Sequence, residues 1–349
     1  MKSTSSGATS SMRRVSLKDI ADELGISQTA VSFAINDRPG VSAETKRRVK
    51  EAAAKMGWRP IYAAQALGSS KTMTVGFAPS RSVQGLKEET FMLHFMAGAH
   101  ESLSRQRYGL LYRPCSSTKE ELDVYRDWAS RKRVDGVILV DLKADDPRPK
   151  LLAELGLPAV LAGGPDPSNL VPSLSIDDSK TMGAILDHLL SRGYRRIAYI
   201  SGDPMLDYSR DREMSFRKFA EINNLEFSSV SFTNFDPNAA LDETLRLLGE
   251  LAAPTAFIYE NEILAAASLH ALAADCLNRD RKSSDGDKRL YPYSIPAIVS
   301  FEDSFVCEAV YPSITSVHRD AGVYGTKVAN LLLKVLACLL YTSPSPRDR

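Results

Sequence analysis

The sequence has few cysteines, and they form no pattern. Cysteine occurs at positions 115, 276, 307 and 338, without a C-x-x-C pair or the spacing of a metal site. This argues against a disulfide framework and favours a reduced intracellular compartment, with the cysteines acting as small buried hydrophobes. The first residues, MKSTSSGATSSMRR, also lack the apolar segment of a secretory signal, so we interpret residues 1–13 as a disordered tail.

Long apolar runs and enzyme signatures are scarce as well. No apolar run approaches the roughly 20 residues of a membrane span, so no membrane association is expected. No G-x-S-x-G, P-loop or G-x-G-x-x-G motif occurs, and the histidines at 94, 100, 188, 270 and 318 fall mostly within helical patterns without metal spacing. The sequence therefore predicts neither an enzyme nor a bound metal or cofactor.

The chain has almost no net charge, because 44 basic residues balance 43 acidic ones and leave +1. The balance is uneven, since residues 13–60 hold ten lysines and arginines against six aspartates and glutamates, an excess of +4. Only this end therefore suits a polyanion such as nucleic acid. The length of 349 residues is that of two or three folded units.

The basic end has the signals of three short helices. Ser16 and Asp19 form a capping-box-like start, Ser27 caps a second helix that ends near Asn36, and Ser42 caps a third. The predicted inward faces are Leu17, Ile20, Ala21 and Leu24, then Val31, Ala34 and Ile35, then Val49, Ala52, Ala53 and Met56. Two short helices joined at a glycine-containing turn, with a third behind them, form the helix-turn-helix layout.

In that layout the second helix enters the major groove with its N-terminal residues leading. The residues off its buried stripe that could reach base edges are Gln28, Thr29, Ser32 and Phe33. Gln28 could pair with adenine, and Phe33 could pack on a thymine methyl group. The predicted phosphate contacts are Ser32, Asn36, Ser42 and Thr45, and Ser27 completes the DNA-binding set. For each polar residue taken alone, capping or solvation is an equally good interpretation.

From Met73 onward, strand-length apolar runs alternate with helical patterns. One series extends from TVGFAPS (residues 74–80) to PAVLAGG (158–164), and a second from TMGAILDHLLSRGY (181–194) to PAIVSFED (296–303). Such alternation predicts parallel sheets covered by helices. The expected fold class is a small all-α helix-turn-helix headpiece plus a two-lobed α/β body with two doubly wound parallel sheets.

The loops after the predicted strands are the candidate ligand site. Ligands of doubly wound sheets collect at the carboxyl ends of the strands, and two lobes place two sets of such ends face to face. These loops mix carboxylates, an amide, arginines and aromatic rings, which suits a polyhydroxylated small molecule. The predicted ligand-binding residues are Ser80, Arg113, Asp141, Arg212, Phe235, Asn261 and Glu302.

The stretch SLKDIADELGISQTAVSFAINDRPGVSAETKRRVKEAAAKMGWRP, residues 16–60, is very similar to the headpiece of the lactose and galactose repressor family of bacterial transcription regulators. The similarity extends to Ala337 and implies a repressor controlled by a sugar-like effector bound in a periplasmic-binding-protein-like body. It also implies that IYAAQALGSSK (61–71) is a hinge that becomes helical on the operator, where Leu67 wedges into the minor groove. Arg212 and Asn261 match the family's effector arginine and amide, and Glu302 stands where most relatives have aspartate.

Some positions depart from the family pattern. Phe33 replaces a base-reading arginine or histidine of many members, and Ala30 replaces a common phosphate-contacting threonine, so the operator sequence is not predicted. Glu302 and Glu262 each replace a usual aspartate, which allows a smaller or differently oriented effector. Induction and co-repression both remain open. The competing class, a periplasmic solute-binding protein, requires an export signal and no basic headpiece, and both requirements fail.

The predicted domains are a tail (1–13), a helix-turn-helix domain (14–59), a hinge (60–72) and an effector-binding and dimerisation domain (73–337). The end CLLYTSPSPRDR (338–349) breaks from the preceding helical pattern and matches a translated sequencing adapter, so we exclude it from fold reasoning. The resemblance implies a final strand beyond Ala337, whose loss would lower stability. We expect a cytoplasmic, nucleoid-associated homodimer, because one headpiece makes too few base contacts for specific affinity.

Overall fold

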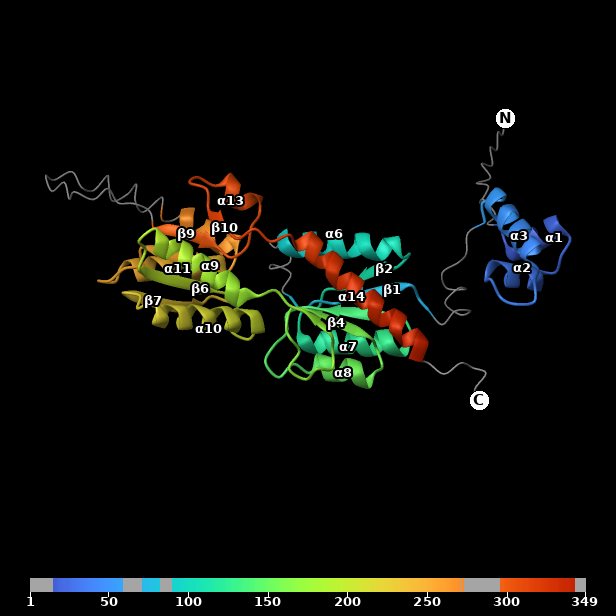
Figure 1. The fold of residues 1–349 in the computed structure, drawn as a ribbon, viewed down its shortest axis with the longest axis horizontal. Coiled ribbons are helices and arrows are strands. Elements are labelled where there is room, and N and C mark those ends of the chain that lie inside the picture. The colour runs from blue at the N-terminus through green and yellow to red at the C-terminus, as the bar shows by residue number, and fades with distance from the viewer. Residues whose placement is uncertain (1–14, 59–70, 82–89, 271, 273–295, 343–349) are drawn as a thin grey trace, which may run out of the picture. The chain divides into compact units, whose positions relative to one another are not determined.

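The computed structural model of the chain describes residues 15–58, 71–81, 90–270, 272 and 296–342 (Figure 1). The chain forms two compact units, Met1–Thr72 and Met73–Arg349. The predicted tail, Leu67 with most of the predicted hinge, and residues 343–349 lie outside the described residues.

The N-terminal unit contains the three predicted helices, α1 (Leu17–Leu24), α2 (Gln28–Ile35) and α3 (Ala43–Lys55). Each begins at the predicted serine cap: the hydroxyl oxygens of Ser16, Ser27 and Ser42 accept backbone N–H groups three residues on. The Asp19 carboxylate also accepts the Ser16 N–H at 2.7 Å, which completes the capping box. The buried core consists of Ile20, Ala21, Val31, Ala34, Val49 and Ala53.

The C-terminal unit begins with lobe 1, a parallel sheet in the order β2-β1-β3-β4-β5. Its strands are β1 (Thr74–Phe77), β2 (Gly109–Tyr112), β3 (Gly136–Leu139), β4 (Ala159–Ala162) and β5 (Ser173–Leu174). Helices α6 (Thr90–Arg105) and α14 (Ala321–Thr342) cover one face, and α7 (Thr118–Ser130) and α8 (Arg148–Glu154) cover the other (Figure 1). The lobe therefore has a separate apolar core on each face of its sheet.

Glycines allow α6 and α14 to approach closely. A Cβ atom on Gly98 of α6 would lie 1.9 Å from the carbonyl oxygen of Gly322, and one on Gly325 of α14 would lie 2.0 Å from that of Phe95. Such contacts are far inside van der Waals distance, so only glycine fits at either crossing point.

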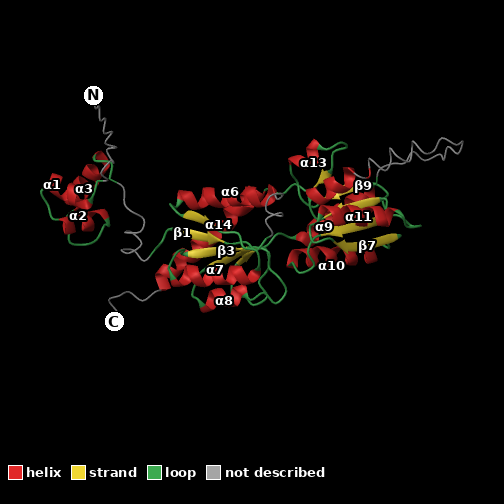
Figure 2. Ribbon diagram, turned by 180° about the vertical axis from the view of Figure 1, so that it is seen from behind, coloured by secondary structure: helices red, strands yellow, loops and turns green. Residues whose placement is uncertain are grey.

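Lobe 2 has the same construction, with the parallel strand order β10-β9-β8-β6-β7 (Figure 2). Its strands are β6 (Arg196–Ser201), β7 (Phe227–Phe232), β8 (Ala256–Tyr259), β9 (Ala297–Ser300) and β10 (Thr315–Ser316). Helices α9 (Asp178–Ser191) and α10 (Asp207–Ile222) pack on one face. The other face is covered by α11 (Pro237–Leu248), helical residues 262–270 and α13 (Phe305–Ala309). Two doubly wound lobes were predicted, and the structure confirms them.

Helix α14 differs from the sequence prediction in two respects. Its segment Ala321–Cys338 is long and apolar enough, by length and composition, to cross a membrane, whereas no such segment was expected. Val328, Ala329 and Leu332 are fully buried in the core of lobe 1, so one face of this helix is part of a protein core. The helix also continues through Thr342, past the predicted break after Ala337, because the sequence contains no proline or glycine between these positions.

Candidate functional site

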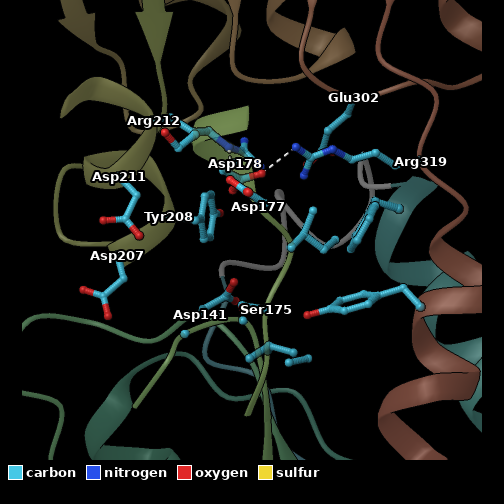
Figure 3. Close-up of a pocket in the computed structure, with 18 of the residues that line it drawn as sticks. Asp141, Ser175, Asp177, Asp178, Asp207, Tyr208, Asp211, Arg212, Glu302 and Arg319 are labelled. Carbon is cyan, nitrogen blue, oxygen red and sulfur yellow. Dashed lines mark hydrogen bonds and ion pairs between the residues drawn. The ribbon is translucent and has the colours of Figure 1, made fainter. Parts of the chain in front are cut away.

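A cavity of about 640 Å³ lies between the two lobes, where the carboxyl ends of their strands meet (Figure 3). Lobe 1 contributes Arg81, Phe91, Met92, Phe95, Val140, Asp141, Ala162–Pro165 and Tyr324. Lobe 2 contributes Asp207, Tyr208, Asp211, Arg212, Met214, Ser215, Lys218, Phe235, Asn261 and Glu302, and the segments that join the lobes add residues 175–179 and Arg319. A pocket of this size can enclose a small organic ligand.

Arg212 on α10 is the central cation of the pocket. Its Nη1 donates to Glu260 at 2.6 Å and its Nε donates to Asp178 at 3.0 Å. The guanidinium lies over the rings of Tyr208 and Phe301, at 5.0 and 4.1 Å from their centroids. Burial alone would lower the pKa of Arg212, but the two carboxylates raise it above its ordinary value, so the residue stays charged. Its Nη2 has no hydrogen-bond partner among the described residues.

A second arginine shares these partners. Arg319 donates from Nη2 to the other oxygen of Asp178 at 2.5 Å and lies 4.9 Å from the centroid of the Phe301 ring. Figure 3 shows Asp178 between the two guanidinium groups. Sequence reasoning did not select Arg319 or Asp178 as ligand-binding residues. The available signal was the position of Asp178 at the end of SLSIDD, directly after a predicted strand.

Glu302 follows β9 and faces the same arginines. Burial raises the pKa of Glu302 to about 7, against the lowering effect of Arg212 and Arg319 and with a further increase from Glu262. Its carboxyl group has no hydrogen-bond partner within the part of the chain that the structure describes. Glu302 can therefore present either a protonated or an ionised carboxyl group to a ligand near neutral pH.

Asn261 caps a helix and also lines the pocket. It precedes helical residues 262–270, and its Oδ1 accepts the N–H of Leu264 at 3.0 Å, as a helix cap does. The side chain is 8% exposed. The cap fixes the amide orientation and leaves the Nδ2 donors unbonded within the described part of the chain.

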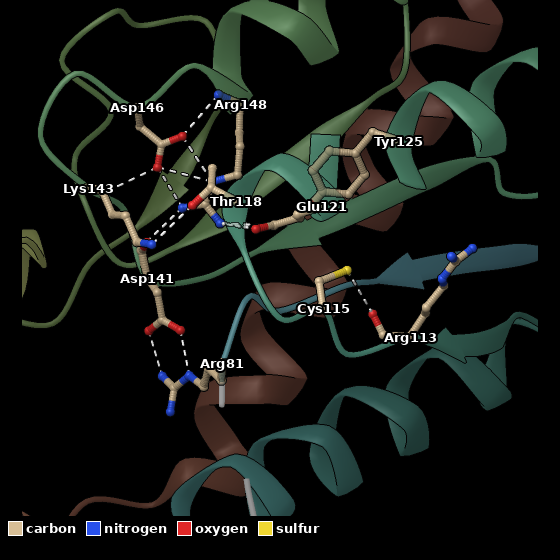
Figure 4. A network of polar contacts seen from close by, with 10 residues as sticks. All are labelled: Arg81, Arg113, Cys115, Thr118, Glu121, Tyr125, Asp141, Lys143, Asp146 and Arg148. Atoms are coloured by element: carbon tan, nitrogen blue, oxygen red, sulfur yellow. Dashed lines mark hydrogen bonds and ion pairs between the residues drawn. The ribbon is translucent and has the colours of Figure 1, made fainter. Parts of the chain in front are cut away.

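The wall from lobe 1 combines one ion pair with aromatic rings. Asp141 accepts two bonds from Arg81, from Nε and from Nη2, both at 2.5 Å (Figure 4). Tyr324 packs against Phe91 and Phe95, with ring centroids 6.5 and 5.7 Å apart. A flat polyhydroxylated ring could stack on such a wall while its hydroxyl groups meet the polar side.

Five of the seven predicted ligand-binding residues line this pocket: Asp141, Arg212, Phe235, Asn261 and Glu302. The other two, Ser80 and Arg113, do not. Arg113 is exposed and follows β2, which is the edge strand of its sheet. Ser80 continues the pairing of β1 with β2 through a bridge to Cys115, and the next residue, Arg81, lines the pocket instead.

The predicted DNA-binding residues lie on and after α2. Gln28 and Thr29 are exposed in its first turn, whereas Ser32 and Phe33 are half-buried. Three other predicted contacts have partners within the unit: the Asn36 amide donates to the Ser32 carbonyl at 2.9 Å, and the hydroxyls of Ser42 and Thr45 lie 2.9 Å apart. Capping is thus real for Ser27 and Ser42, but each hydroxyl retains further hydrogen-bonding capacity.

Comparison with known proteins agrees with both parts of this geometry. The model for bacterial regulatory proteins of the lacI family matches residues 16–60, and the model for a periplasmic binding protein-like domain matches residues 186–278. The chain is 31% identical over 264 residues to the HTH-type transcriptional regulator AglR of Rhizobium meliloti (strain 1021), which covers 74% of this chain and 73% of AglR. The chain belongs to the LacI family. It is a DNA-binding transcription regulator, as the resemblance implied, and the match to a DNA-binding domain excludes a pure solute-binding protein.

Two solved structures resemble most of the chain. The complex of the transcriptional regulator CelR with cellobiose superposes with a TM-score of 0.66 at 26% identity, covering 95% of each chain. The Lac repressor dimer bound to operator and the anti-inducer ONPF gives a TM-score of 0.76 at 20% identity, covering 93% of this chain and 94% of that one. The second likeness concerns the fold alone. The relatives are named as transcription regulators rather than as enzymes.

Proposed function

We propose that this LacI-family regulator is a repressor that binds a saccharide, without chemical conversion, in the pocket between its lobes. The observation that carries the proposal is the combination of Arg212 Nη2, Asn261 Nδ2 and the Glu302 carboxyl group in one pocket. Each is free of hydrogen-bond partners within the described residues, and the facing aromatic wall suits a sugar ring. The solved complex of the relative CelR with cellobiose supports the same ligand class.

Operator recognition is proposed for the exposed start of α2. Gln28 and Thr29, with Ser32 and Phe33 on the next turn, would read base edges in the major groove. Asn36, Ser42, Thr45 and Ser27 would position the unit on phosphates. Leu67, outside the described residues, would enter the minor groove at a central base step.

The working form is proposed to be a homodimer in the cytoplasm, associated with the nucleoid. Two headpieces double the number of base contacts, and their two-fold relation requires a pseudo-palindromic operator. The ligand would act by binding one lobe arrangement more tightly than another, because a ligand shifts an equilibrium only by its differential affinity for the two states.

The operator proposal is tested by selecting duplexes from a random-sequence pool with the full chain. A motif with two-fold symmetry is expected, and Leu67→Ala should weaken binding to it. Selection of a motif without symmetry, or unchanged binding by the Leu67 variant, would contradict this part of the proposal.

The ligand proposal is tested by a thermal-shift screen of neutral mono- and disaccharides, with cellobiose included, followed by operator titration with each hit. Arg212→Ala should abolish the shift, whereas Arg217→Ala should retain it. Arg217 is the matched control because it lies on the same helix, is exposed, and within the described residues forms an ion pair with Glu213 alone. Equal shifts for both variants would show that the saccharide binds elsewhere.

A further inference from the structure

A buried ion network lies outside the pocket, in lobe 1 (Figure 4). The Arg148 side chain is 1% exposed and pairs with two carboxylates, those of Glu121 and Asp146, which are 1% and 3% exposed. Nη1 donates to both oxygens of Glu121 at 2.9 and 3.1 Å, and Nη2 donates to Asp146 at 2.6 Å. The mechanism proposed above uses none of these groups.

Arg148 and Asp146 fix the turn formed by residues 141–146. Nη2 of Arg148 also donates to the carbonyl oxygen of Asp141 at 2.7 Å. The Asp146 carboxylate accepts the backbone N–H of Lys143 at 3.1 Å. Asp141 and Asp145 both have left-handed backbone conformations, with φ of 55° and 51°. Such conformations are uncommon for residues other than glycine, so the turn relies on its surroundings to hold its shape.

The same turn is bonded to lobe 2. Leu142 accepts the backbone N–H of Asp207 at 2.9 Å, and the N–H of Ala144 donates to Met205 at 3.4 Å. These two bonds flank an antiparallel bridge between Lys143 and Leu206. We call residues 142–144 and 205–207 the interlobe bridge. Its lobe 2 side leads directly into α10, the helix that carries Tyr208 and Arg212 in the pocket.

We propose that Arg148 is a positioning residue that sets the interlobe bridge and the pocket wall together. By holding the 141–146 turn, it places the Asp141 side chain against Arg81 and the Leu142 carbonyl against the first N–H of α10. A movement of Asp141 in the pocket would therefore also move the Leu142 carbonyl, and so alter the interlobe bridge. A buried ion pair is by itself weak evidence for stabilisation, so the proposal is based on the contacts of Arg148 with the turn rather than on the energy of the network.

Hydrogen–deuterium exchange of the full, ligand-free chain tests this role. In Arg148→Met, amides in residues 203–210 of lobe 2 should exchange about fivefold faster, because loss of one bridge bond removes protection of that order. Arg126→Met is the matched control, since Arg126 on α7 is exposed and pairs with Asp123. A purely structural role for Arg148 would accelerate exchange only within lobe 1, around residues 115–147, and would overturn the proposal.

A second pair of variants removes one bridge bond without touching the buried charges. Asp207→Pro removes the backbone N–H that donates to the Leu142 carbonyl. Proline fits here because Asp207 is the first residue of α10, where proline is common. The preceding residue, Leu206, has φ −84° and ψ 132°, which are suitable backbone angles for a residue before proline. Asp207→Ala is the control, because it loses the same carboxylate but keeps the N–H.

In Asp207→Pro, amides of residues 141–147 should exchange about fivefold faster than in Asp207→Ala. This comparison tests the coupling between the turn and lobe 2, on which the role of Arg148 depends, even if Arg148→Met does not fold. Equal exchange in the two Asp207 variants would show that the turn is not coupled to lobe 2, and the proposal would be wrong. The outcome does not depend on whether the pocket binds a saccharide.

Discussion

Glu302→Gln should change how the stability of the protein depends on pH. The pKa of Glu302 is raised from its ordinary value of 4.5 to about 7. Between these two values the folded state binds more protons than the unfolded state, so the free energy of unfolding falls as pH rises and levels off above pH 7. The difference between these two pKa values corresponds to at most roughly 3–4 kcal/mol, and solvent screening of this partly exposed group reduces the effect to roughly 1–2 kcal/mol.

Glutamine cannot ionise, so the variant should lack this decrease and should melt several degrees above the parent at about pH 8, with a smaller difference at about pH 5. Melting curves across this range provide the measurement. Asp303→Asn is the control: hydrogen bonds from Ser316 and His318 lower the pKa of Asp303, so its contribution is lost only at lower pH. Identical pH profiles for the parent and Glu302→Gln would refute the assignment of a protonatable carboxyl group to the pocket.

Three further predictions follow from the geometry. Gly98→Ala should lower the free energy of unfolding, measured with a chemical denaturant, by about 1–3 kcal/mol or more, because the added Cβ would clash with the backbone of α14. Gly183→Ala on α9 is the control: its Cβ would enter open space, so this variant should be neutral or stabilising. Arg212→Lys should weaken saccharide binding in calorimetry by about tenfold or more, because the three donors of lysine share one nitrogen and cannot reproduce the planar fork that reaches Glu260 and Asp178 and still presents Nη2 to the pocket. Phe33→Ala should change the preferred bases of the selected operator more than the salt dependence of binding, since it is uncharged.

Local signals made the helix-turn-helix unit predictable in detail. A serine at each helix start and the apolar spacing between caps are short-range features, and the structure places Ser16, Ser27 and Ser42 as the predicted caps. The central parallel strands of both lobes could be predicted as well, because buried runs such as residues 136–139 and 256–259 are apolar throughout, whereas the two-residue edge strand β10 (Thr315–Ser316) has no such run and was not predicted.

The pocket was only partly predictable, because strand ends reveal which loops meet but not which side chains point inward. The loop after β1 illustrates this limit: Ser80 was selected, while Arg81 lines the pocket. Arg319 and Asp178 lie 141 residues apart in the chain, and no sequence pattern connects them. The ion network of Arg148 could not be predicted either, because no sequence pattern connects Glu121 with Arg148, and both look like ordinary charged residues of surface helices.

The ion pair between Arg319 and Asp178 lies where the chain passes between the two lobes, so it can influence their relative arrangement. The chain leaves lobe 1 after β5 and enters lobe 2 at Asp178, and it returns to lobe 1 through the segment between β10 and α14 that contains Arg319. The pair therefore joins the two segments that connect the lobes, and it does so in the lining of the pocket. A ligand that competes for Asp178, or for Arg212 beside it, acts directly on those connections. Binding energy released in the pocket can thus change the angle between the lobes without a longer chain of intermediate contacts.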